Sequence, residues 1–139
     1  MIRRVVSGHD KAGKAIVASD EQVSGLEIPG MSGFEILNIW GSDETHQYPD
    51  DGSKQDYQSF FAPVGGYRFL LFTVPPDEPV ATQDSAATPT EMEANFPGLL
   101  DTFKPDEPGM HRSATVDLLY VMEGRCELEL DGGERVTLS

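Results

Sequence analysis

The chain has 139 residues, which is the size of one domain and leaves little room for a second. Its net charge is −14, and residues 41–139 carry nineteen acidic against six basic side chains, which argues against nucleic acid and anionic membranes as partners. The single cysteine, Cys126, excludes an intramolecular disulfide framework and fits a reducing compartment, so we expect a cytoplasmic protein.

The N-terminal region predicts a β-hairpin. Two short β-branched runs, around residues 5–6 and 16–17, flank a turn rich in Gly and Asp. Residues 8–15, GHDKAGKA, nearly match the phosphate-binding P-loop pattern, but Ala15 stands where Ser or Thr is required. The residues that follow favour a strand and not the helix that a P-loop must open, so we interpret this stretch as a hairpin turn.

Two further strands are predicted before residue 76. Residues 34–40 alternate with apolar side chains on both faces, and residues 66–74 form the most apolar strand, stopped by Pro75 and Pro76. Between them, residues 41–58 are polar and without periodicity, which predicts a surface loop. Together with 14 Gly and 10 Pro, these short strands indicate an all-β domain.

An acidic connector with one short helix follows, over residues 77–107. Thr88 is the expected N-cap, Pro89 occupies the first helical position, and Glu91 stands three residues after Thr88, which completes a capping-box pattern. The apolar residues that follow at helical spacing predict a short helix over about residues 89–96.

The last third of the chain predicts a strand and a hairpin. Residues 115–122 are rich in strand-forming side chains, and residues 125–130 alternate strictly, with Cys126 and Leu128 on one face and Glu127 and Glu129 on the other. Residues 131–133 turn the chain, and residues 136–138 resume the apolar face. We therefore expect Cys126 to be a buried core thiol and the two glutamates to be solvated.

Residues 108–124, PGMHRSATVDLLYVMEG, resemble the first motif of the cupin superfamily, with Gly109, His111, Asp117 and Gly124 at the motif's spacing. The resemblance implies a cupin-type jelly roll, a double-stranded β-helix, formed by one domain over residues 1–139. Its parts are an N-terminal strand region (1–76), the connector (77–107), and the motif with its hairpin (108–139). The family's second motif does not occur before Ser139, so we expect the barrel to be incomplete and the natural chain to continue.

A strand over residues 111–117 places alternate side chains on one face. That face carries His111, Ser113, Thr115 and Asp117, and the cupin resemblance directs it into a cavity, where Tyr67 is a further candidate for ligand binding. The reverse face is apolar and needs cover, which favours a homodimer. Its residues are Ala114, Val116, Leu118, Tyr120 and Met122.

This chain departs from the metal-binding pattern of the family. Ser113 stands in place of the second His, and Asp117 in place of the usual Glu. Two ligands are one short of the three that a catalytic metal site normally takes from the protein. We therefore expect no cofactor. A divalent metal would be held by His111 and Asp117, and only if a second motif supplied the remaining ligand.

Two functions remain open. The first is binding of a small organic molecule without an assignable reaction. The alternative is a cupin enzyme of small-molecule metabolism, of the lyase, isomerase or cyclase type, with His111 as acid/base and Asp117 orienting it. A metal-dependent dioxygenase is the weakest alternative. His9 and His46 lie in a predicted turn and a predicted loop, and we interpret both as surface residues.

Overall fold

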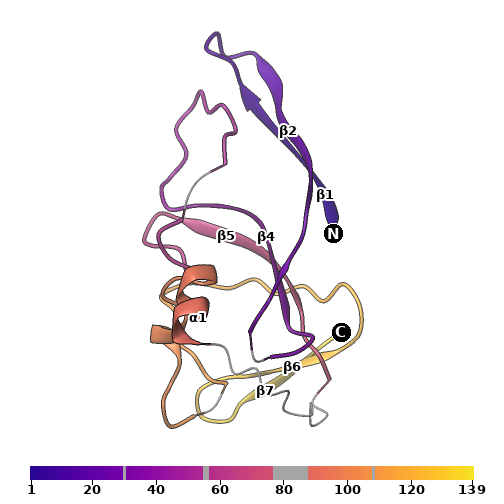
Figure 1. Ribbon diagram of the computed structural model, residues 1–139, viewed down its shortest axis with the longest axis vertical. Coiled ribbons are helices and arrows are strands. Elements are labelled where there is room, and N and C mark those ends of the chain that lie inside the picture. Colours follow the sequence, from indigo (N-terminus) through magenta and orange to yellow (C-terminus); the bar gives the residue numbers. More distant parts are fainter. Residues whose placement is uncertain (30, 55–56, 77–87, 108) are drawn as a thin grey trace.

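Three small antiparallel sheets and one short α-helix form the described part of the protein (Figure 1). The computed structural model describes residues 1–29, 31–54, 57–76, 88–107 and 109–139. Residues 77–87 of the predicted connector and Pro108 of the predicted motif lie outside them. The predicted all-β class with one helix is confirmed, and within the described residues no sheet closes into a barrel.

The first sheet is the predicted N-terminal hairpin. β1 (Ile2–His9) pairs with β2 (Ala15–Val23), and Figure 1 shows this hairpin projecting from the rest of the chain. Asp10 closes the turn, because its Oδ1 accepts the amide N–H groups of Ala12 and Lys14, each at 2.9 Å. The stretch that resembles a P-loop is therefore a hairpin turn, as predicted.

The second sheet has the order β3–β4–β5. β3 (Leu26–Glu27) is short, whereas β4 (Glu35–Ser42) and β5 (Tyr67–Thr73) confirm the two strands predicted from apolar runs. The register of β4 and β5 shifts between Asn38 and Trp40, which marks a β-bulge.

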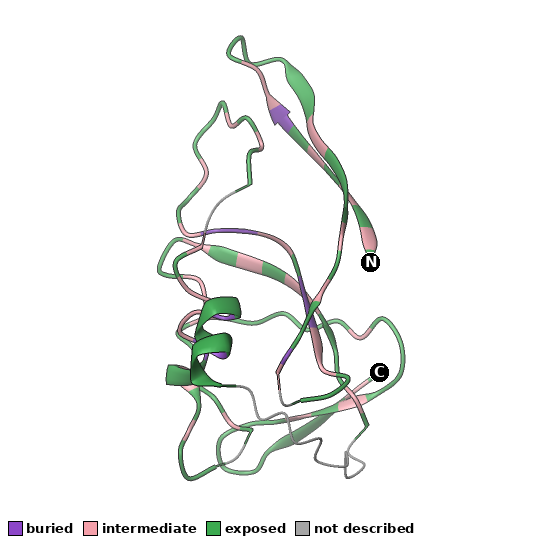
Figure 2. Cartoon of the chain, in the orientation of Figure 1, coloured by how far each residue is buried: buried purple, intermediate pink, exposed green. Residues whose placement is uncertain are grey.

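The helix α1 (Pro89–Asn95) carries the predicted capping box, in which the Thr88 side chain accepts from the Glu91 amide and the Glu91 side chain accepts from the Thr88 amide. A 3₁₀ turn, η1 (Leu100–Thr102), follows. The helix region packs on β4 and the chain near β3, and Figure 2 shows how few segments are buried. The core cluster consists of Ile28, Ile36, Met92, Phe96 and Leu99. No helix of the described residues is long and apolar enough to cross a membrane.

The third sheet is the predicted C-terminal hairpin of β6 (Cys126–Glu129) and β7 (Arg135–Leu138). The alternation holds, with Cys126 and Leu128 half-buried and Glu127 and Glu129 exposed. Cys126 is thus only partly covered, and not the fully buried thiol that we expected.

The strand predicted over residues 115–122 does not form. A strand needs a hydrogen-bonding partner, and within the described residues no ladder includes this segment. Its apolar side chains are open to solvent, with Val116 103% and Leu118 98% exposed. The whole chain exposes 10739 Å², against roughly 7,000 Å² for a folded monomer of this mass by the usual scaling.

Arg68 joins β5 to the loops around it. Its side chain is 7% exposed, forms an ion pair with Asp43, and lies over the ring of Tyr57 at 4.1 Å from the centroid. Its N–H groups also donate to four backbone carbonyl oxygens at 2.8 to 3.1 Å, those of Ser42, Ser59, Phe60 and Tyr67. A planar guanidinium with five donors fits this set, and an ammonium group does not.

Replacing Arg68 by Lys tests these contacts, which we call the Arg68 clamp. We expect Arg68→Lys to lower the free energy of unfolding by about 2 kcal/mol, because several partly buried carbonyl oxygens lose their donor. Urea unfolding followed by circular dichroism measures the loss. The matched control is Arg135→Lys, since Arg135 is 58% exposed and pairs with Glu127 and Glu129 on the surface. Equal losses in the two variants would contradict the role assigned to Arg68.

Candidate functional site

His111 lies between aromatic rings on the surface of the protein. Its backbone forms an isolated antiparallel bridge with Phe103, which follows η1. The imidazole is stacked on Phe61, with ring centroids 5.7 Å apart and an interplanar angle of 25°. The Phe103 ring is tilted by 58° against the imidazole, with the centroids 6.0 Å apart.

 His111 itself is exposed, so one side of this aromatic group is open to a ligand.

The other polar residues of the predicted face lie along the same extended segment. The hydroxyl oxygens of Ser113 and Thr115 are 2.7 Å apart and share a hydrogen bond. Asp117 is exposed, and within the described residues no hydrogen bond joins it to His111. The structure thus brings Ser113 and Thr115 together, and it does not pair His111 with Asp117.

Tyr67, the fifth residue predicted to bind a ligand, belongs to a different cluster. It is the first residue of β5, and its hydroxyl group lies 2.9 Å from Nε2 of His46. Nδ1 of His46 in turn lies 2.6 Å from Oδ2 of Asp50. These three residues form a connected chain of side chains that we call the Asp50–His46–Tyr67 relay.

The tautomer of His46 follows from its partners. An ionised carboxylate only accepts hydrogen bonds, so Nδ1 of His46 carries the proton that is donated to Asp50. Nε2 then has a free lone pair and accepts the hydroxyl hydrogen of Tyr67. His46 lies in the predicted loop with its side chain 26% exposed, and hydrogen bonds at both ring nitrogens give it partners that the sequence did not indicate.

The environment shifts two pKa values in the relay. The pKa of Asp50 lies below its usual range, first because its carboxylate accepts the Gly52 amide and second because it accepts from His46. Burial raises the pKa of Tyr67, and an opposing contribution comes from Trp40. The ground state is therefore an ionised Asp50 and a neutral Tyr67.

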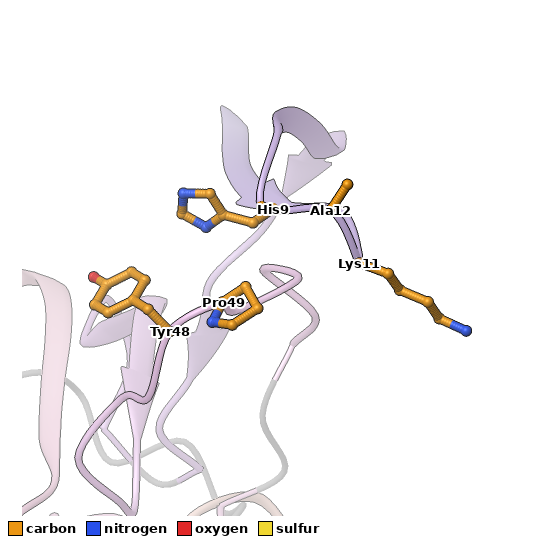
Figure 3. A pocket seen from close by; sticks show the side chains of 6 residues that line it. His9, Lys11, Ala12, Tyr48 and Pro49 are labelled. Carbon is orange, nitrogen blue, oxygen red and sulfur yellow. The ribbon is translucent and has the colours of Figure 1, made fainter.

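A shallow pocket lies where the β1–β2 turn meets the loop after β4 (Figure 3). The rings of His9 and Tyr48 meet edge to face there, 5.7 Å apart. The backbone N–H of His9 donates to the carbonyl oxygen of Asp50 at 2.7 Å. This bond connects the β1–β2 hairpin to the loop that contains His46 and Asp50. His9 therefore has a structural contact in addition to its place in the predicted turn.

The relay left one signal in the sequence. His46 and Asp50 are four residues apart in a segment that contains Pro49, but Tyr67 follows 21 residues after His46, and no local pattern connects them.

As for metals, the described residues contain no group of three or more potential ligands, so His111 and Asp117 remain a predicted pair only.

Comparison with known proteins found no matching family model, no matching curated protein and no matching solved structure.

The lowered pKa of Asp50 predicts a pH-dependent contribution to stability. We expect Asp50→Asn to reduce the free energy of unfolding by about 1 kcal/mol at pH 7. Because the pKa of Asp50 is depressed in the folded state, this contribution is present above the unfolded pKa of about 3.9 and is lost as the pH falls through the folded pKa. Urea unfolding of both proteins between pH 7 and pH 3 measures the difference.

Glu44→Gln is the control, since Glu44 is exposed and lies two residues before His46. A difference between wild type and Asp50→Asn that stays constant down to pH 3 would contradict the linkage to Asp50 ionisation.

Proposed function

We propose that the protein binds a small organic ligand, and that residues 109–124 contribute to a site of the cupin jelly-roll type. Two features support the cupin proposal. Gly109 and Gly124, at the glycine positions of the motif, have φ values of 84° and 85°, a conformation that favours glycine. The β6–β7 hairpin follows directly, as the resemblance implies.

The observation that carries the ligand proposal is the composition of the surface around His111. An exposed imidazole lies against two aromatic rings, and the Ser113 and Thr115 hydroxyl groups follow on the same segment. Ligand sites typically combine aromatic walls with a few polar groups that fix orientation. A planar molecule with a hydrogen-bonding group fits this surface.

Catalysis by His111 with Asp117 is less well supported. That mechanism needs the carboxylate to orient the imidazole, and no hydrogen bond between the two occurs in the described structure. The charge of −14 supports a small ligand over nucleic acid or an anionic membrane, and the single cysteine supports a cytoplasmic location.

Ligand binding is tested with a library of small heteroaromatic and carboxylic compounds, screened by saturation-transfer NMR against protein with ¹³C-labelled histidine. We expect bound compounds to shift the His111 ring signal, and His111→Ala to weaken their affinity at least about tenfold, a loss of about 1.4 kcal/mol. The control is His9→Ala. A library without binders, or binders that retain full affinity for His111→Ala, would contradict the proposal.

We also propose that a second copy of the chain covers the apolar side chains of residues 116–122. Val116, Leu118, Tyr120 and Met122 are 72% exposed or more. Apolar side chains that cluster on a surface commonly mark an interface. A homodimer through this segment would remove them from water and supply the backbone partners that the segment lacks.

Analytical ultracentrifugation tests the dimer. We expect wild-type protein to show concentration-dependent association and Val116→Asp to weaken it at least about tenfold, since a charge at a dry interface costs more than 1.4 kcal/mol. Val64→Asp is the matched control, because Val64 is 102% and Val116 is 103% exposed and both changes add the same charge. A wild-type protein that stays monomeric at all concentrations contradicts the proposal.

A further inference from the structure

We infer that the Asp50–His46–Tyr67 relay is an acid–base site that takes a proton from a small enolisable carbonyl compound placed against the Tyr67 hydroxyl group. The site is separate from the His111 surface and does not depend on the ligand proposed there. Its evidence is the continuous hydrogen-bonded chain, with distances of 2.6 Å and 2.9 Å, and the partial exposure of its last member.

Asp50 and Tyr67, the two ends of the relay, are held in place by different elements. Asp50 accepts the Gly52 amide at 2.8 Å through Oδ1, and its carbonyl oxygen accepts the His9 amide of β1 at 2.7 Å. Tyr67 precedes Arg68 in β5, and the Arg68 guanidinium donates to its carbonyl oxygen at 3.0 Å. A preorganised chain of this kind spends little free energy on orientation when a proton moves.

Access to solvent increases along the relay. As whole residues, Asp50 and His46 are half-buried, whereas Tyr67 is 40% exposed. The titratable neighbours are His9 of β1, and Tyr48, Asp51 and Tyr57 of the segment between β4 and β5. A compound from solvent therefore approaches Tyr67, the most exposed residue of the three, while His46 and Asp50 act behind it. Tyr67 is the catalytic residue, and His46 and Asp50 are positioning residues that also hold the displaced proton.

The proposed step balances without a further reactant. The C–H bond next to the carbonyl group breaks, and its proton goes to the Tyr67 oxygen. The Tyr67 O–H bond breaks at the same time, and that proton goes to Nε2 of His46. The electron pair stays on the compound as an enolate, and Asp50 stabilises the imidazolium ion that forms. Return of the proton to carbon, at the same or a conjugated position, restores the relay.

The strength of the base indicates the class of compound. Tyr67 passes on one proton as it takes another, so the net base is the imidazole of His46, a weak base that accepts protons only from strongly acidic C–H bonds. C–H bonds become this acidic when two carbonyl groups flank them. We therefore assign 1,3-dicarbonyl compounds to this site, with exchange or isomerisation by proton transfer as the reaction.

The test uses ethyl acetoacetate in D₂O as the probe, with loss of the C2 proton signal followed by NMR. We expect the full protein to accelerate exchange above the buffer rate with saturation by the probe. Tyr67→Phe and His46→Gln should each lower the protein-dependent rate at least about tenfold. Tyr48→Phe is the matched control, since it removes the same group from a tyrosine that lies in the loop of His46 and is 79% exposed.

Two further readouts separate catalysis from folding. Urea unfolding should show that Tyr67→Phe remains folded, and the ¹⁵N shifts of His46 should show a protonated Nδ1 in wild type. No exchange above buffer by folded wild-type protein overturns the inference. So does a Tyr67→Phe variant that exchanges at the wild-type rate, because a purely structural hydroxyl group would give that result.

Discussion

The buried guanidinium of Arg68 is the interaction on which the rest of the structure depends. The loops around residues 42–43 and 57–61 contain little regular structure, and their carbonyl oxygens need donors. Arg68 supplies them from a fixed position in β5, and Asp43 balances its charge. Because Tyr67 and Phe61 adjoin this clamp, both the relay and the aromatic surface at His111 rest on it.

The sequence predicted those elements that hydrogen bonds between neighbouring residues stabilise. The β1–β2 hairpin follows from a turn that Asp10 closes, and the helix follows from Thr88 and Glu91, whose side chains cap its first turn. The segment 115–122 has equally good strand propensity, but a strand also requires a partner, and propensity cannot supply one. That one difference explains why the hairpins formed as predicted while this segment did not become a strand.

The candidate sites likewise contain local contacts, which the sequence predicts, and long-range contacts, which it does not. Alternation placed Ser113 and Thr115 on one side of an extended chain, and their hydroxyl groups do meet. The relay was missed because it joins a loop residue, His46, to a strand residue far along the chain. Only the packing of the loop against β1 and β5 brings them together. The stacking of Phe61 on His111 is likewise a long-range contact that no spacing rule encodes.

The small core has a thermodynamic consequence. Six apolar side chains are buried in the described part of a 139-residue chain, so unfolding exposes little new apolar surface. The heat-capacity change of unfolding scales with that surface and should fall below the typical value of about 12–15 cal/mol/K per residue. The stability curve of the isolated chain is then broad and flat. Warming and cooling therefore change the free energy of unfolding only gradually. Polar contacts such as those of Arg68 determine the maximum value that this free energy reaches.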